Sequence, residues 1–180
     1  MLCSKLINPY IRVAMNSILT GPRVINNRTL FDYEIIFVKE GKCNITYDNT
    51  NYVAQKNQVI FIRPGITHKI EIAENIKFFQ PHIHFDAIYN INSEITTVSF
   101  KPRDIMTQDE LNLIQQDIFY KTDIPVIFTP ENIQKFEKTF FKIIDLFSER
   151  KNNYELLCKG KMLELKFSAY EKLYLQRLED

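Results

Sequence analysis

Tryptophan is absent from the 180 residues, and cysteine occurs only three times, at Cys3, Cys43 and Cys158. The cysteines are far apart, and no Cys-x-x-Cys pair or Cys/His cluster is present, so the sequence indicates neither a disulfide framework nor a zinc knuckle. The apolar run at the N-terminus is too short for a signal peptide, and no later run reaches membrane-spanning length. These absences predict a reduced, cytoplasmic protein.

The chain also has no excess of either charge, since 23 basic and 22 acidic residues leave a net charge of +1. Such a balance does not favour a nucleic-acid or membrane surface. No internal repeat or low-complexity segment is visible in the sequence. What the chain does have is 45% apolar residues, with 14 Phe and 9 Tyr, which predicts a packed globular domain of ordinary size.

Up to about residue 100, short apolar runs are separated by turn-forming residues. The turn chemistry lies at Glu40-Gly41, Asp48 to Asn51, Lys56-Asn57, Pro64-Gly65 and Glu74-Asn75. Short strands at such close spacing predict an antiparallel sandwich or barrel. The expected strands are Ile11–Ser17, Glu34–Lys39, Cys43–Tyr47, Tyr52–Ala54, Val59–Ile62, His68–Ile72, Lys77–Phe85 and Thr96–Phe100.

After residue 105, the apolar period changes to three and four residues. Thr107 and Glu110 form a capping box, which predicts a helix that continues through Ile118. Thr129-Pro130-Glu131 is a second helix start, and Asn152 to Glu155 marks a break and a third. The stripe of the second helix comprises Ile133, Phe136, Phe140, Ile143 and Phe147. The third helix carries Leu163, Phe167, Tyr170 and Tyr174 on one side, with Gly160 at a bend or a late start.

These patterns predict a mainly β fold of the α+β type, with strands first and helices second. We expect a barrel over residues 1–105 and a helical region over 106–180 that packs on it, the two forming one structural domain. The last two helices are expected to form an antiparallel hairpin, whose broad apolar faces cover the sheet or bury a partner chain.

A resemblance to a known family emerges from the order of four segments. DYEIIFVKEG, QVIFIRPGITHKI, PHIHFD and FEKTFFKIIDLF are similar to segments of the N-terminal sensor and dimerisation region of AraC-type transcription regulators. The resemblance covers Ile11 to Leu178. It implies a cupin-like antiparallel β-barrel, or jelly roll, that binds a small effector, often a sugar, and a homodimer formed through the C-terminal helices.

AraC-type regulators bind DNA through helix-turn-helix units that follow the sensor region, and this chain has no residues after Asp180. The resemblance therefore implies either a truncated regulator or a stand-alone sensor module. The last helix ends without a stop signal, which favours truncation. Residues Lys151–Asp180 show no basic recognition face.

The metal-binding motif of cupins is incomplete in this chain. It typically has His-x-His, three residues and then Glu, followed later by a His after a Gly turn. Glu34 and His68 match this pattern, but Arg28 and Leu30 occupy the two other His positions. We therefore expect a metal-free barrel with no cofactor, since we do not expect His82 or His84 to replace the missing ligands.

The segment PHIHFD places Gln80, His82, His84 and Asp86 on one face of a strand. If that face lines the barrel, Gln80 and His82 can hydrogen-bond sugar hydroxyls; otherwise the polar face lies in solvent. His84 is a further candidate ligand, although a structural role for His84 and Asp86 is equally expected.

Arg28, Glu34 and His68 are the remaining candidates for ligand binding. Arg28 either offers its guanidinium fork to hydroxyls or a carboxylate, or pairs internally with Glu34. His68 begins a strand and is either a hydrogen-bonded core residue or a cavity residue. Arg63, just before the Pro64-Gly65 turn, is expected at the surface or rim.

The main hypothesis is a ligand-sensing, dimerising domain that is not an enzyme and has no catalytic residue. An effector would shift the population of arrangements of barrel, N-terminal segment and helices, and Asn8–Arg12 could close over the ligand. The alternative is a small cupin enzyme, a sugar isomerase or lyase, that uses Glu34 and His68 as an acid–base pair. A third hypothesis is a dimerisation scaffold whose barrel is filled by phenylalanine.

Overall fold

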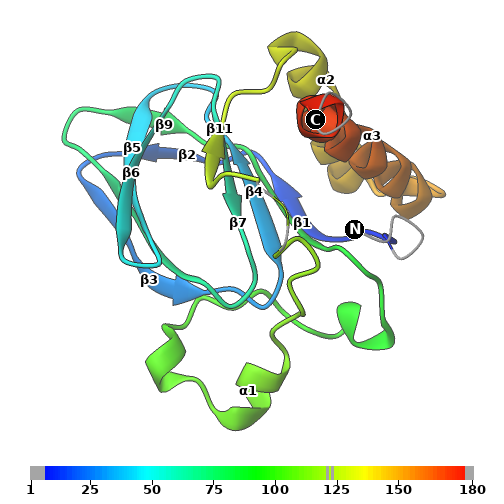
Figure 1. Cartoon of the computed structure of the whole chain (residues 1–180), viewed down its shortest axis with the longest axis horizontal. Helices are drawn as coiled ribbons and strands as arrows, with labels where there is room; N and C mark the ends of the chain where they lie inside the picture. Colours follow the sequence, from blue (N-terminus) through cyan, green and yellow to red (C-terminus); the bar gives the residue numbers. More distant parts are fainter. Residues whose placement is uncertain (1–6, 121, 123, 177–180) are drawn as a thin grey trace.

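A computed structural model of the chain describes residues 7–120, 122 and 124–176. Within the last helix, side chains are described as far as Leu165. Two facing antiparallel sheets make up the barrel, and two helices cover the outer face of one of them (Figure 1). No helix among the described residues is both long and apolar enough to cross a membrane.

The sheets are built from strands that are distant in sequence and pair antiparallel throughout. The five-stranded sheet contains, in spatial order, β1 (Tyr10–Met15), β10 (His82–Asp86), β4 (Tyr33–Phe37), β7 (Val59–Ile62) and β11 (Ile127–Phe128). The four-stranded sheet contains β3 (Arg23–Thr29), β8 (Thr67–Ile72), β5 (Lys42–Tyr47) and β6 (Thr50–Gln55). A short ribbon pairs β2 (Ile18–Thr20) with β9 (Lys77–Phe79).

The turns lie where the sequence predicts them, and each contains a residue in the left-handed backbone region. These residues are Gly41, Asp48, Asn49, Asn57, Gly65 and Asn75. Gly, Asn and Asp adopt positive φ more readily than other residues, so they mark the chain reversals. At Gly41, a Cβ atom would lie 2.2 Å from the carbonyl oxygen of Lys77, so only glycine fits.

Alternation along the strands divides the buried residues into two cores. On β4, Ile36 faces the barrel interior, whereas Tyr33 and Phe37 face the helices. The interior core is mostly aliphatic, and its aromatic members are Tyr47 and Phe78. Most buried phenylalanines lie instead in the outer core, so they join the sheet to the helices rather than fill the barrel.

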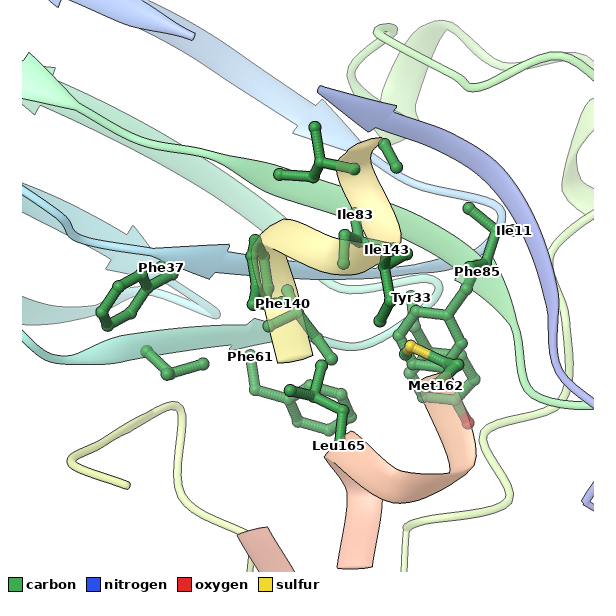
Figure 2. Close-up of a cluster of buried hydrophobic side chains, with 14 of the residues drawn as sticks. Ile11, Tyr33, Phe37, Phe61, Ile83, Phe85, Phe140, Ile143, Met162 and Leu165 are labelled. Atoms are coloured by element: carbon green, nitrogen blue, oxygen red, sulfur yellow. The ribbon is translucent and has the colours of Figure 1, made fainter. Parts of the chain in front are cut away.

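The outer core is formed by α2 (Ile133–Glu149) and α3 (Tyr154–Gln176), which pack side by side against the five-stranded sheet (Figure 2). The predicted apolar stripe of the second helix is confirmed, with Phe136, Phe140 and Ile143 buried against Phe37 and its neighbours. In α3 the buried residues include Met162 and Leu165. The expected contributions of Phe167, Tyr170 and Tyr174 lie outside the side chains that the structure describes.

Several predicted strand boundaries are wrong. The strand expected over Lys77–Phe85 is two strands in different sheets, because Pro81 lacks the amide hydrogen that a continuous ladder needs. The expected strand Thr96–Phe100 is an extended segment outside the sheets. The pattern also missed β2 and β11, which are very short, and β3, whose NNRT sequence shows no apolar alternation.

Helix starts and ends also differ from the prediction. The Thr107 capping box is present, but α1 (Gln108–Asn112) ends well before Ile118. α2 begins three residues after Pro130, with Asn132 rather than Thr129 as its N-cap. α3 is helical from Tyr154, so it does not start late at Gly160.

Arg63 anchors the irregular segment between α1 and α2. Its guanidinium donates hydrogen bonds to Asp117 Oδ2 (3.1 Å) and to the carbonyl oxygens of Phe119, Thr122 and Ile124. Arg63 was expected at the surface or rim, and its side chain is 17% exposed. These bonds hold Asp117, Phe119, Thr122 and Ile124 to the residue that follows β7.

Candidate functional site

One end of the barrel carries a group of buried charged and polar side chains. This polar cluster comprises Arg12, Arg28, Asp32, Glu34, His68, His84 and Asp86. The side chains come from five strands of both sheets and from the turn before β4. Because they point to the same side as Ile36 and Ile70, they face the interior between the sheets.

Strand register brings the members of the polar cluster together. Arg28 on β3 is the direct Cα partner of His68 on β8, and Glu34 on β4 is the partner of His84 on β10. Directly opposite residues of an antiparallel pair have adjacent side chains. The positions therefore follow from the pairing of distant strands.

A continuous line of polar contacts crosses the interior. Arg28 Nε donates to His68 Nε2 (2.9 Å), and Arg28 Nη2 donates to Glu34 Oε2 (2.8 Å). Glu34 Oε1 lies 3.3 Å from His84 Nε2, and His84 Nδ1 lies 3.3 Å from Asp32 Oδ1. The line links the four-stranded sheet to the five-stranded sheet through Arg28.

Arg12 extends the polar cluster to the edge strand β1. Its guanidinium forms a bidentate pair with Asp86, at 2.6 Å and 2.8 Å, and also donates to the carbonyl oxygen of Thr96. Asp32 Oδ2 lies 3.7 Å from Arg12 Nε. The expected closing segment Asn8–Arg12 thus lies along the sheet edge, with Arg12 reaching inward.

Burial and neighbouring charges together set the protonation of the titratable side chains in the polar cluster. Burial disfavours the charged form of His84, but Glu34 and Asp32 outweigh it and raise the pKa of His84 to about 9. Burial would raise the pKa of Glu34, but the positive charges of His84 and Arg28 hold it well below its usual value. Burial, reinforced by Arg28, lowers the pKa of His68 to about 4. Burial raises the pKa of Asp32, and His84 opposes this shift. A positive His84 therefore faces a negative Glu34, with His68 neutral.

Of the two roles considered for Arg28, the structure shows the internal pair with Glu34. The guanidinium also separates Glu34 from His68, since it donates to both. A direct proton transfer between these two side chains, as the enzyme hypothesis requires, is therefore blocked in this arrangement.

His82 lies beside the polar cluster, whereas the side chain of Gln80 contacts Ser17 instead of the cluster. Gln80 is buried, and its amide Nε2 lies 3.4 Å from Ser17 Oγ. The ring of His82 is partly exposed and packs edge-to-face on His84, with 5.7 Å between ring centroids. Burial lowers the pKa of His82. His82 is thus a neutral, accessible imidazole next to a charged one.

Sequence reasoning missed Arg12 and Asp32. Asp32 follows the buried Leu30 and Phe31 in LFDYE, and Arg12 lies near the buried Ile11 and Ala14 in YIRVAM. A charged residue among apolar neighbours was the signal available. A buried charged side chain needs an oppositely charged or hydrogen-bonding partner, but the sequence does not indicate which residue that is. For Arg12 the partner is Asp86, 74 residues away.

The metal set that cupins typically use does not fit this chain. Leu30 is fully buried in the interior core, and Arg28 is a cation paired with Glu34. However, the structure brings Glu34, His82 and His84 together, with one ligand atom from each lying within 4.8 Å of the others. The geometry therefore favours His82 and His84 as metal ligands, contrary to the expectation from the sequence.

Residues 96–101 have no regular secondary structure and contact the polar cluster. Thr29 N donates to Lys101 O (2.9 Å), while Thr96 O accepts from Arg12. The Phe100 ring lies over Arg28, with 5.6 Å from Cζ to the ring centroid. The segment therefore covers the polar cluster and contacts it at both ends.

A cavity of about 320 Å³ lies outside the barrel, between the start of β1 and the helix hairpin. Its lining includes Tyr10, Tyr89, Phe147 and Tyr154. None of the predicted ligand-binding residues lines it.

An antiparallel barrel with a buried polar cluster at one end and a helical hairpin on its outer face defines the class as a cupin-like domain. More specifically, the chain belongs to the AraC-like ligand binding domain family, whose profile matches residues 19–165. This match confirms the family resemblance inferred from the four segments.

Solved cupin structures resemble parts of the chain. The cupin domain of Cnp3 from Schizosaccharomyces pombe has 14% identity and a TM-score of 0.39, covering 42% of this chain and 55% of that chain. YhaK from Escherichia coli has 15% identity and a TM-score of 0.40, and the match covers 46% of this chain and 39% of YhaK. A predicted oxalate decarboxylase from Thermotoga maritima has 15% identity and a TM-score of 0.40, and the match covers 44% of this chain and 69% of that chain. At such values these similarities carry no argument about function. No match was found among curated protein sequences.

Proposed function

We propose that this chain is the effector-sensing and dimerisation domain of an AraC-type transcription regulator. The family match supports ligand binding. The observation that carries the proposal is the polar cluster, which gathers hydrogen-bonding side chains from both sheets at one end of the barrel. We expect DNA contacts to come from a domain outside this chain.

The ligand we propose is a small polar organic molecule, with a sugar as the leading candidate. Arg28, Glu34, His68, Gln80, His82 and His84 offer both donors and acceptors, as hydroxyl groups require. The segment 96–101 would have to move for a ligand to enter, because it covers the polar cluster.

The polar cluster also offers a route from the ligand to the helices. Arg12 belongs to β1, and β1 packs against both α2 and α3. A ligand that changes the Arg12–Asp86 pair would alter the position of β1 and, through it, the helix hairpin. Such differential contacts are what a population shift between two arrangements requires.

A thermal-shift screen of sugars and other polar metabolites, on chelator-treated protein, tests the ligand. We expect at least one compound to raise the melting temperature of the native protein but not that of Arg28→Lys. Val53→Glu, on the exposed face of β6, is the matched control and should respond like the native chain. If no compound stabilises the protein across a broad library, the scaffold hypothesis is preferred.

We further propose that α3 contributes to a homodimer. Leu156 and Leu157, near its start, are 69% and 51% exposed, which is a large apolar exposure for a helix surface. Light scattering after size exclusion should show a dimer for native protein and for Val53→Glu, but a monomer for the double substitution Leu156→Glu/Leu157→Glu. A dimer that survives the double substitution would show that these leucines are not at the interface.

A further inference from the structure

Three side chains with metal-binding chemistry meet at the junction of β4 and β10. Glu34 and His84 are each 2% exposed, and His82 is partly exposed beside them. One ligand atom from each side chain lies within 4.8 Å of the other two. We propose that Glu34, His82 and His84 form a binding site for a divalent transition metal ion such as Zn²⁺.

The surroundings of both histidines hold their rings in the orientation that a metal site needs. His84 Nδ1 lies 3.3 Å from Asp32 Oδ1, and His82 Nδ1 lies 3.2 Å from the carbonyl oxygen of Gln80. Each Nδ1–H can donate to its oxygen acceptor, which leaves both Nε2 atoms as ligands. Metal-binding histidines usually have such an oxygen acceptor on the second ring nitrogen.

The carboxylate is positioned in the same way. Glu34 Oε2 accepts a hydrogen bond from Arg28, so Oε1 remains on the side of His84, at 3.3 Å from its Nε2. Asp32 adds a second buried negative charge behind His84, and no hydrogen bond to its Oδ2 is found within the described part of the chain. A metal ion bound here would replace the proton of His84, so that the two carboxylates would face the ion instead of an imidazolium.

His82 distinguishes a metal site from a purely internal ion pair. An ion pair needs only His84 between Asp32 and Glu34, and these contacts exist without His82. Yet the His82 ring packs on His84, and across the residues described its Nε2 has no hydrogen-bond partner. A metal ion gives this third side chain a role and, because His82 is partly exposed, a path of entry.

The donor set selects the class of ion. Two imidazole nitrogens and one carboxylate oxygen suit Zn²⁺, Co²⁺, Ni²⁺ or Fe²⁺, whereas Mg²⁺ and Ca²⁺ prefer oxygen ligands alone. Three protein ligands leave at least one coordination position open for water or an organic ligand. The site uses β10 in place of the missing motif positions Arg28 and Leu30. It does not depend on the proposed sensing role.

Calorimetric titration of the full chain, after treatment with chelator, tests the proposal with the metal alone. We expect one equivalent of Zn²⁺ to bind with micromolar or tighter affinity, and Mg²⁺ not to bind. His82→Ala should weaken binding at least a hundredfold, and Asp32→Asn tenfold to a hundredfold. Glu40→Gln is the matched control, since the Glu40 side chain is 52% exposed and lies outside the polar cluster, and this variant should bind Zn²⁺ like the native chain.

Absence of stoichiometric Zn²⁺ binding, or equal binding by His82→Ala, would overturn the proposal. Circular dichroism melting of each variant separates loss of ligand from loss of fold. The visible absorption of Co²⁺ bound to the native chain gives a test that needs no variant. A Co²⁺ spectrum that shows no coordination by imidazole nitrogen would also contradict the proposed metal site.

Discussion

Substitution of Arg12 by Gln removes the cation that holds Asp86 in the polar cluster. The two side chains are 6% and 0% exposed and form a bidentate pair at 2.6 Å and 2.8 Å. Without Arg12, Asp86 loses its paired cation, and Asp32 loses the guanidinium 3.7 Å away. Removing one partner of a buried ion pair costs about 3–5 kcal/mol, because the remaining charge stays desolvated.

For a chain of this size, that loss corresponds to a fall in melting temperature of roughly 6–20 °C. Urea unfolding followed by far-ultraviolet circular dichroism suits the measurement, because the sequence has no tryptophan for fluorescence. Lys161→Gln is the matched control: it breaks an exposed pair with Glu164, whose side chains are 42% and 40% exposed. We expect that control to cost about 0–1 kcal/mol.

A double-mutant cycle completes the test. Arg12→Gln and Asp86→Asn should together cost less than the sum of the single changes, with a coupling above about 1 kcal/mol. If Arg12→Gln destabilises no more than Lys161→Gln, the pair is not buried as described, and the proposed route from the polar cluster to β1 fails with it.

Three further predictions concern single residues. The pKa of His68 is lowered to about 4, so the unfolded chain, with a His pKa of about 6.5, takes up this proton first and stability falls as pH drops from about 6.5 toward 4. Urea titrations at pH 6.5 and pH 4 should show that His68→Gln loses less stability between these two pH values than the native chain, by up to about 3 kcal/mol. An equal loss in both proteins would contradict a neutral buried His68. Arg63→Ala should accelerate hydrogen exchange at Phe119, Thr122 and Ile124 while the strands keep their protection, because these residues lose their contacts with the guanidinium. An equal acceleration across the strands would be the contrary result. Gly41→Ala should destabilise the protein by about 1–3 kcal/mol, because φ is 82° and a backbone carbonyl oxygen blocks the Cβ atom. Gly160→Ala, on an open helix surface, should stabilise the protein by about 0.5–1 kcal/mol. Two changes of the same sign in urea denaturation would refute the conformational argument.

Much of the secondary structure could be predicted because its causes are local. A turn at Gly65 or Asn75 follows from the backbone preferences of one or two residues. The capping box at Thr107 and the stripe on α2 follow from contacts three and four residues apart. The errors arose where tertiary context intervened, as at Pro81, where the chain passes from one sheet to another.

The candidate site could be predicted only in part. Arg28, Glu34, His68 and His84 were identified from motif positions and alternation, and the structure brings them into contact. Arg12 was not identified as a site residue, because nothing near it in sequence indicates its partner.

The sequence by itself determined where the chain turns and which strand faces are apolar, because these depend on neighbours within a few positions. Only the tertiary structure decided which charges meet. Antiparallel pairing places Arg12 with Asp86 and Glu34 with His84 across separations of about 50 to 74 residues. The register that aligns them is set by the packing of whole sheets, which no local pattern encodes.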